Sequence, residues 1–187
     1  DDQTRGLARQ ASTDPAAFGR LWQRVAPATL AFLSLRAPAT LSRHLGPDDL
    51  LNDTCLRVWK GFSTFDENCG TFRAWTIAIA RRVLADALAR LARTPVTEFQ
   101  SNTESQRSPV DDPPAEITSV SRVAARHEGL RLLIARIATW AEPDRKLFLA
   151  RAIEDREHKD IAAALGISVE AAEKRWQRLR RELRDLE

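Results

Sequence analysis

The chain has 187 residues, of which 43% are hydrophobic and 29% are charged. This length suits one ordinary domain or two small ones. The composition excludes a wholly disordered chain, a collagen and a disulfide-dense secreted module, and the net charge of +3 is too small to indicate a partner by itself.

Neither export nor membrane insertion is indicated by the sequence. The first ten residues, DDQTRGLARQ, lack the apolar core of a signal peptide, and no run of about 18 apolar residues occurs. We therefore expect a cytoplasmic protein without membrane insertion. Because the chain contains no Met, we also expect that its N-terminus has been trimmed or processed.

Cysteine and histidine are too scattered to predict a metal site or a disulfide framework. Cys55 and Cys69 lack the grouped spacing of zinc ligands, and we expect both to be reduced, buried small residues. His44, His127 and His158 stand far apart and are expected at the surface or at helix caps. We expect no metal and no cofactor.

A first helix is predicted from Asp14 onwards. Asp14 suits an N-cap, Pro15 suits the first helical turn, and apolar residues then repeat at helical spacing from Phe18 to Val25. We expect the helix to be broken and renewed after Pro27.

A second helix is predicted to open at Gly46-Pro47-Asp48-Asp49, where the acids complement the positive end of the helix dipole. Gly61 and the turn over 66–70 are expected to end it. Its buried stripe is expected at Leu51, Cys55, Val58, Trp59 and Phe62.

A third helix, capped by Thr71, carries a dense group of arginines. Between Thr71 and Arg93 five arginines oppose a single acid, Asp86, which suits binding to a polyanion. From the pattern alone, a solvated helix face explains the arginines equally well. Its buried face is expected at Phe72, Trp75, Ile79, Val83 and Leu88.

The segment that follows predicts a linker. It contains four of the nine prolines, and five acids face one base between Thr94 and Thr118. Helical apolar spacing is lacking here, so we expect a polar, acidic linker over 94–120.

The last third of the chain predicts further helices that end in a helix-turn-helix. After helices near Leu130 and Pro143, the segment HKDIAAALGISVEAAEKRWQRLRREL predicts a short helix, a turn at Gly166 and a long helix capped by Ser168. Small Ala162 and Ala163 are expected to allow the two helices to approach closely. A long helix of this kind can enter a DNA major groove.

The predicted fold class is therefore all-α. We expect two small helical domains over residues 1–93 and 121–187, joined by the linker over 94–120. Trp59, Trp75 and Trp176 lie on apolar stripes, which favours core packing over base stacking.

Two blocks of the chain together resemble a known family. The run DDLLNDTCLRVWKGFSTFDENCGTFRAWTIAIARRVLADALAR resembles region 2 of bacterial RNA polymerase sigma factors, and EPDRKLFLARAIEDREHKDIAAALGISVEAAEKRWQRLRREL resembles their region 4. The resemblance spans Phe18–Arg93 and Leu130–Arg184, and it is to the small extracytoplasmic-function type. It implies binding to core RNA polymerase and to promoter DNA, and an anti-sigma protein as a further partner.

In region 2, the resemblance implies a polymerase-binding helix and a helix that binds the minus-ten element as a single strand. Relatives commonly carry Gln and Glu in place of Asn52 and Asp53, and Asn in place of Arg82. On the pattern alone, Asp49, Asn52 and Asp53 of the second predicted helix would simply complement the positive end of its dipole. The residues implied for polymerase binding are Asp49, Asn52, Asp53 and Arg57, and those for the minus-ten element are Arg73, Arg81, Arg82, Asp86 and Arg90.

In region 4, the resemblance implies that the long C-terminal helix reads the minus-thirty-five element in duplex DNA. Two roles are open for Glu173, where relatives often carry Lys: it accepts a hydrogen bond from a cytosine amine, or it bonds to Gln177. The residues expected at this surface are Ser168, Glu170, Ala171, Lys174, Arg175 and Arg178.

No motif of an enzyme is present. The chain lacks a Gly-rich phosphate loop, a G-x-S-x-G turn and paired histidines on a helix, so we expect no catalysis. Two alternatives to a sigma factor are a conventional helix-turn-helix regulator that acts without polymerase, and a helical adaptor that binds only protein.

Overall fold

The structure, a computed structural model, describes residues 14–93 and 128–184, and all regular elements within these ranges are helical. The all-α prediction is confirmed. The chain divides into two compact units, Asp1–Leu130 and Arg131–Glu187. The predicted linker and the predicted domain boundary at residue 121 lie outside the described residues, so the boundaries stay predictions.

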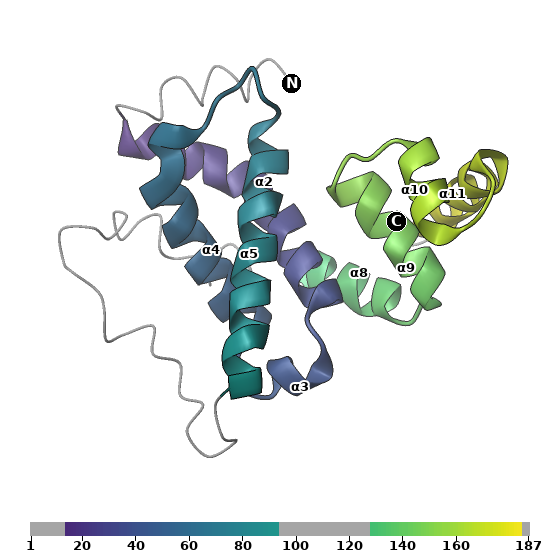
Figure 1. The fold of residues 1–187 in the computed structure, drawn as a ribbon, viewed down its shortest axis with the longest axis horizontal. Helices are drawn as coiled ribbons and strands as arrows, with labels where there is room; N and C mark the ends of the chain where they lie inside the picture. Colours follow the sequence, from purple (N-terminus) through teal and green to yellow (C-terminus); the bar gives the residue numbers. More distant parts are fainter. Residues whose placement is uncertain (1–13, 94–127, 185–187) are drawn as a thin grey trace. The chain divides into compact units, whose positions relative to one another are not determined.

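In the described part of the first unit, three long helices each pack against the other two (Figure 1). Their packed faces bury Phe18, Leu33, Leu50 and Ile77 almost completely. The elements are α2 (Pro15–Arg36), α3 (Ala39–Ser42), α4 (Pro47–Gly61), a 3-10 turn (Phe62–Thr64) and α5 (Phe72–Arg93).

Helix α2 begins where the sequence predicts, because the Asp14 carboxylate accepts a hydrogen bond of 2.9 Å from the backbone N–H of Ala16. The expected break at Pro27 does not occur, since α2 continues to Arg36 as one helix. The buried hydroxyl of Thr29 bonds to the Val25 carbonyl at 2.9 Å, which satisfies a polar group within this apolar interface.

Helix α4 is closed at its N-terminus by Asp49, whose carboxylate accepts a 2.9 Å hydrogen bond from the backbone N–H of Gly46. Leu50, Leu51, Cys55 and Val58 then form a stripe that is at most 2% exposed. The stripe holds α4 against α2 and α5, and the opposite side of α4 faces away from these two helices.

Helix α5 is capped as predicted, because the Thr71 hydroxyl accepts a 3.1 Å hydrogen bond from the N–H of Ala74. Its buried face differs partly from the prediction. Trp75, Ile79 and Leu88 are only half-buried. The fully packed positions are Phe72, Thr76, Ile77, Ala80, Val83, Leu84 and Ala87.

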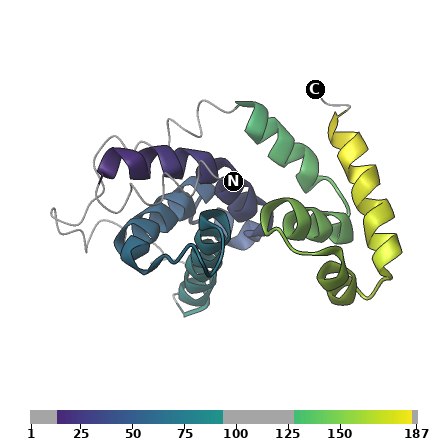
Figure 2. The same ribbon diagram turned by 90° about the horizontal axis from the view of Figure 1, so that it is seen from above.

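The second unit contains the helix-turn-helix. Gly166 ends α10 with a φ of +66°, and the N–H of Ile167 bonds back to the Ala162 carbonyl at 3.1 Å. In Figure 2 the chain turns sharply there before the long helix α11. The elements are α8 (Glu128–Ala138), α9 (Glu142–Phe148), a π-helical turn (Leu149–Ile153), α10 (His158–Leu165) and α11 (Val169–Arg184).

One apolar cluster holds α9, α10 and α11 together. Leu147, Ile161, Ala172 and Leu179 are at most 1% exposed, and Trp176 packs beside them. Burial of these side chains fixes which face of α11 turns inward, and therefore which face is left for a partner.

Two expectations about small residues are wrong. Cys55 is buried and Cys69 is free, as predicted, but Cys69 is exposed because it lies in the turn before α5 and outside the apolar stripes. Ala162 is buried, whereas Ala163 is exposed and does not line the contact between α10 and α11. Within the described ranges, no helix has the length and apolar character needed to cross a membrane.

Candidate nucleic-acid and polymerase interfaces

The exposed side of α5 presents positive charge. Arg82 and Arg90 are exposed and form no ion pair with any residue that the structure describes. Arg81 is also exposed, and its guanidinium lies 6.0 Å from the ring centroid of Phe32 in α2, whereas Arg73 is half-buried near the helix start. These side chains can meet a phosphate backbone, and Arg82 and Arg90 can do so without breaking an existing ion pair.

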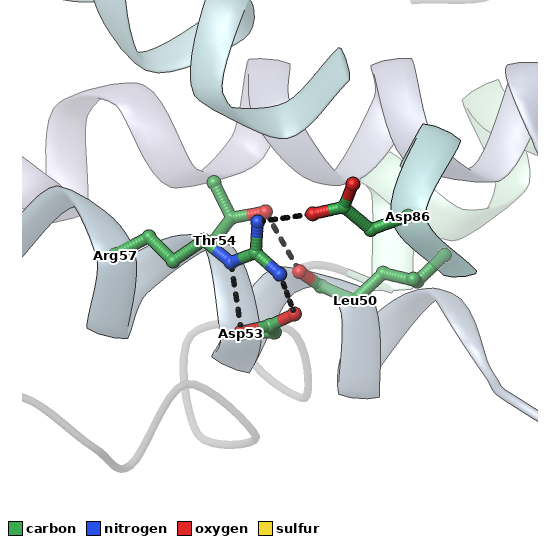
Figure 3. A network of polar contacts seen from close by, with 5 residues as sticks. All are labelled: Leu50, Asp53, Thr54, Arg57 and Asp86. Atoms are coloured by element: carbon green, nitrogen blue, oxygen red, sulfur yellow. Dashed lines mark hydrogen bonds and ion pairs between the residues drawn. The ribbon is translucent and has the colours of Figure 1, made fainter. Parts of the chain in front are cut away.

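Asp86, the single acid of α5, is held by α4. Its carboxylate accepts a 2.6 Å hydrogen bond from Nη1 of Arg57, and Nε and Nη2 of Arg57 each lie 3.3 Å from an oxygen of Asp53 (Figure 3). Partial burial opposes the charge of Arg57, but the bonds to Asp86 and Asp53 outweigh it and raise the pKa of Arg57. The structure thus brings together residues that the sequence assigned to two different surfaces.

The remaining predicted residues of α4 have different surroundings. Asp49 is exposed and caps its own helix. Asn52 is half-buried, and its side-chain Oδ1 has no hydrogen-bond partner among the described residues although that atom is shielded from solvent. An unsatisfied buried carbonyl is costly, so Asn52 is suited to accept a hydrogen bond from a partner that repacks this face.

The connection between α4 and α5 is built on aromatic rings. Phe62, Phe65, Phe72 and Trp75 lie with ring centroids 5.3–6.4 Å apart. The rings of Trp59 and Phe18 meet edge to face, with their centroids 4.8 Å apart. Trp59 and Trp75 therefore pack against other rings, but both remain partly exposed at the edge of the cluster, so the expected full burial of their stripes is not reached.

An acidic turn follows this aromatic cluster. The Asp66 carboxylate accepts 2.9 Å hydrogen bonds from the backbone and the side-chain amide of Asn68. The backbone hydrogen bond is the largest of the effects that lower the pKa of Asp66. Cys69 donates to the same carboxylate at 3.4 Å, which raises the pKa of the Cys69 thiol. The turn therefore has a defined shape next to α5.

The N-terminus of the long helix α11 is capped as predicted. The Ser168 hydroxyl accepts a 3.1 Å hydrogen bond from the N–H of Ala171. Glu170 and Lys174 form an exposed ion pair of 2.7 Å one turn apart, and Ala171 is exposed beside them. This pair lies on the side of α11 opposite Ala172.

Arg175 and Arg178 are held by an acid of α9. Asp144, whose side chain is 17% exposed, accepts a 2.7 Å hydrogen bond from Nη2 of Arg178 and lies 3.5 Å from Nε of Arg175. The Arg178 side chain remains 54% exposed. Arg178 can therefore rotate towards a partner, whereas Arg175 is more enclosed.

Two models of known protein families match the chain and identify the family to which it belongs. A model of sigma-70 region 2 matches residues 21–94, and a model of sigma-70, region 4 matches residues 130–183. The chain belongs to the sigma-70 family. The predicted resemblance to its extracytoplasmic-function type is confirmed, and the chain is a sigma factor.

Individual relatives resemble the chain along most of its length. It is 29% identical over 187 residues to RNA polymerase sigma factor NccH of Alcaligenes xylosoxydans xylosoxydans, covering 95% of this chain and 90% of the relative. A solved structure of CnrH in complex with the cytosolic domain of CnrY is 28% identical and covers 97% of this chain and 95% of that chain, with a TM-score of 0.44.

Within this sigma factor, region 2 contains all predicted polymerase and minus-ten residues, and region 4 contains all predicted minus-thirty-five residues. Their individual roles remain predictions. In the described part of region 4, Glu173 makes no hydrogen bond with Gln177, which was one of the two roles open for it.

Two features of these surfaces were missed by the sequence reasoning. Arg181 is exposed and follows Lys174 and Gln177 at spacings of seven and four residues, so it continues their face of α11. Helical spacing alone could have found it. Asp144 could not have been found in this way, because it meets Arg178 across 34 positions of sequence.

Proposed function

We propose that this sigma factor directs core RNA polymerase to specific promoters and assists promoter melting. The observation that carries the proposal is that one chain contains two separate surfaces suited to binding DNA. Region 2 exposes Arg82 and Arg90 on α5 without internal ion pairs among the described residues, and region 4 ends in a capped helix-turn-helix. Binding at two places on a promoter would fix both register and strand separation.

The proposed polymerase-binding surface is α4. Asp49, Asn52 and Asp53 follow one another at helical spacing, with Asp49 exposed and Asn52 lacking a hydrogen bond within the described residues. Arg57, which the resemblance adds to this set, bonds instead to Asp53 and Asp86 within region 2. Acidic and amide groups on a helix suit a basic, hydrogen-bonding protein surface. The chemistry supports this assignment, which draws on the family resemblance for the identity of the partner.

The proposed minus-ten surface is α5 with the turn before it. Arg73, Arg81, Arg82 and Arg90 would contact phosphates, and the partly exposed rim of the aromatic cluster lies close to the helix start. Single strands are generally held by such a combination of cations and rings. Capture of unpaired bases lowers the free energy of the melted state, so it favours opening.

The proposed minus-thirty-five surface is the exposed face of α11. Ser168 fixes the start of the helix, and Lys174 and Arg178 project from its exposed sides. Such a helix can place its first turns against base edges in the major groove while its cations contact phosphates. Glu170, Ala171 and Arg175 complete the proposed set.

Transcription from purified components tests the proposal. A library of promoter fragments is transcribed by core RNA polymerase with and without the chain, and transcript starts are sequenced. We expect starts that depend on the chain and that share sequence motifs at minus ten and minus thirty-five. Duplex binding without polymerase, or no starts with active core, would instead favour a conventional regulator or an adaptor.

We also propose an anti-sigma protein as a partner, on the family resemblance. Such a partner would cover the polymerase-binding or DNA-binding surfaces described above. When added in equal amount, it should abolish the chain-dependent starts. It should leave elongation from a preformed scaffold unchanged, because that step needs core polymerase alone.

A further inference from the structure

The contact between Arg57 and Asp86 joins α4 to α5 across 29 positions of sequence. It is a short contact of 2.6 Å, and neither side chain is fully exposed: Arg57 is 38% exposed and Asp86 is 55% exposed. Both helices lie in region 2, one on the proposed polymerase surface and the other on the proposed minus-ten surface. The contact therefore bridges two surfaces that must work together.

All three nitrogens of the Arg57 guanidinium donate hydrogen bonds to carboxylates of the same unit. Nη1 binds Asp86, while Nε and Nη2 bind the two carboxylate oxygens of Asp53 (Figure 3). A planar guanidinium can bind two carboxylates in this way because its donors have a fixed geometry, which the single ammonium of a lysine lacks. Most of the hydrogen-bonding capacity of Arg57 is thus directed into the protein and away from a partner.

Asp86 occupies a position that determines how α5 presents its cations. It follows Arg82 by four residues and precedes Arg90 by four, so the three side chains lie along one side of the helix. A link to α4 at this point adds a polar restraint on α5 to the apolar packing between the two helices. It acts next to Arg82 and Arg90 and so restrains the part of α5 that carries them.

We propose that Arg57 and Asp86 act as one positioning pair, which holds the arginine face of α5 in place for strand capture, and that neither acts as an independent contact to polymerase or DNA. The inference rests on the proposed function. It assigns Arg57 a role inside region 2, and it leaves Asp49, Asn52 and Asp53 as the proposed polymerase contacts of α4. Without the pair, α5 still folds but its cations no longer meet the strand in one defined arrangement.

A double-mutant cycle in the full chain, assembled with core polymerase, tests the pair. The variants are Arg57→Gln, Asp86→Asn and the double variant, and the measurements are affinity for core and open-complex formation on a promoter from the transcription experiment. We expect each single variant to lower opening about fivefold and the double variant to lower it by the same factor, because residues that act only through each other are not additive. Affinity for core should stay unchanged.

Three further variants separate positioning from other roles. Asp86→Glu keeps the carboxylate within reach of Arg57 and should retain most of the opening. Arg57→Lys should lose part of it, because an ammonium lacks the planar, fixed donor geometry with which the guanidinium binds Asp53 and Asp86 together. Arg20→Gln removes another Arg–Asp pair of the same unit, Arg20 with Asp14, which does not join α4 to α5. It should leave both measurements unchanged.

The outcomes that would overturn the inference are distinct from failure of the proposed function. Independent roles predict that the two losses multiply to about 25-fold in the double variant. A purely structural role predicts that core affinity falls together with opening. Either result overturns the pair alone, whereas absence of chain-dependent transcription with the unaltered chain overturns the proposed function and the pair with it.

Discussion

Asp144 shows how a single acid can control the charge that the proposed DNA-binding helix α11 presents. It binds Arg178 at 2.7 Å and lies 3.5 Å from Arg175, and it comes from α9, outside the helix that it neutralises. A DNA phosphate would have to compete with this carboxylate for Arg178. The ion pair between Asp144 and Arg178 should therefore weaken the binding of α11 to arbitrary DNA sequences more than its binding to a site that offers good base contacts.

We expect Asp144→Asn to raise the affinity for any duplex DNA about fivefold, because an additional exposed charge contact contributes about 1 kcal/mol. The ratio of specific to nonspecific binding should fall. The measurement is competition between promoter and random duplexes for the polymerase complex that contains the chain. Glu142→Gln is the matched control, since Glu142 lies on the same helix but binds Lys146. Equal behaviour of the two variants would contradict the role of Asp144.

The two cysteines should differ in reactivity. Burial raises the pKa of Cys55 to about 12, which keeps its thiol neutral, whereas Cys69 is exposed and its pKa is raised by the hydrogen bond to Asp66. The thiolate is the reactive form. At pH 8 a thiol reagent should therefore modify one cysteine of the folded chain, and mass spectrometry should place the label on Cys69.

Cys55 should react only when the chain unfolds, at a rate that follows unfolding in denaturant. The sign of the alkaline effect follows from the same pKa. Because the folded state holds a proton that the unfolded state loses above about pH 9, the thiol should contribute a loss of stability between pH 9 and about 12. Cys55→Ala should remove this contribution, and prompt labelling of Cys55 in the folded chain would contradict its burial.

At the scale of the helix, N-caps decide where each functional element begins. Ser168 sets the first turn of α11, and with it the position of the residues that follow. Ser168→Ala should lower the free energy of unfolding by about 1 kcal/mol, the usual cost of losing such a cap. Thermal unfolding would measure the loss, and transcription that depends on the minus-thirty-five element should fall as well.

Ser168→Asp is the control for this effect, because aspartate also caps helices and complements the positive end of the dipole. It should restore stability to nearly the original value. If Ser168→Asp were as unstable as Ser168→Ala, the cap would not be the reason for the loss.

The helix starts were predictable from the sequence because capping is a local interaction. Asp14, Asp49, Thr71 and Ser168 each bond to a backbone N–H two or three residues away. The break expected at Pro27 was wrong because propensity alone could not weigh the packing of the apolar residues on both sides of it.

The buried face of α5 and the charge pairs required tertiary structure. Helix α5 packs on both α2 and α4, so its buried face is broad and includes the small residues Thr76 and Ala80. Cys69 was expected to be buried on the basis of its residue type, although a turn exposes it. The partners of Arg57 and Arg178 lie 29 and 34 positions away, beyond the reach of any local pattern.

At the scale of the whole molecule, the proposed function divides promoter binding between two units. On the proposed DNA-binding helices α5 and α11, few of the described cations project without an internal partner, so each unit should bind DNA weakly by itself. Attachment of both to one polymerase makes the second contact effectively intramolecular, which raises the overall affinity without any new contact. The units should therefore contribute independently to the salt dependence of the assembled complex.

This independence gives a quantitative prediction. Each phosphate contact on a single strand contributes about 0.7 to the slope of log K against log salt, and each contact on duplex DNA contributes about 0.9. Arg82→Gln, on the proposed single-strand surface, should lower the magnitude of the slope by about 0.7, and Arg178→Gln, on the proposed duplex surface, by about 0.9. The double variant should lose about the total of the two, because the sites lie in different units.

Promoter binding by the assembled complex, measured between about 50 and 200 mM salt, checks these slopes. Arg20→Gln serves as the control for the loss of a positive charge outside both surfaces, and it should leave the slope unchanged because exposed charges more than about 10 Å from the DNA are screened. An equal change in slope for all three variants would mean that net charge alone governs binding. A change for Arg178→Gln without one for Arg82→Gln would restrict DNA contact to region 4 and remove α5 from the proposed minus-ten surface.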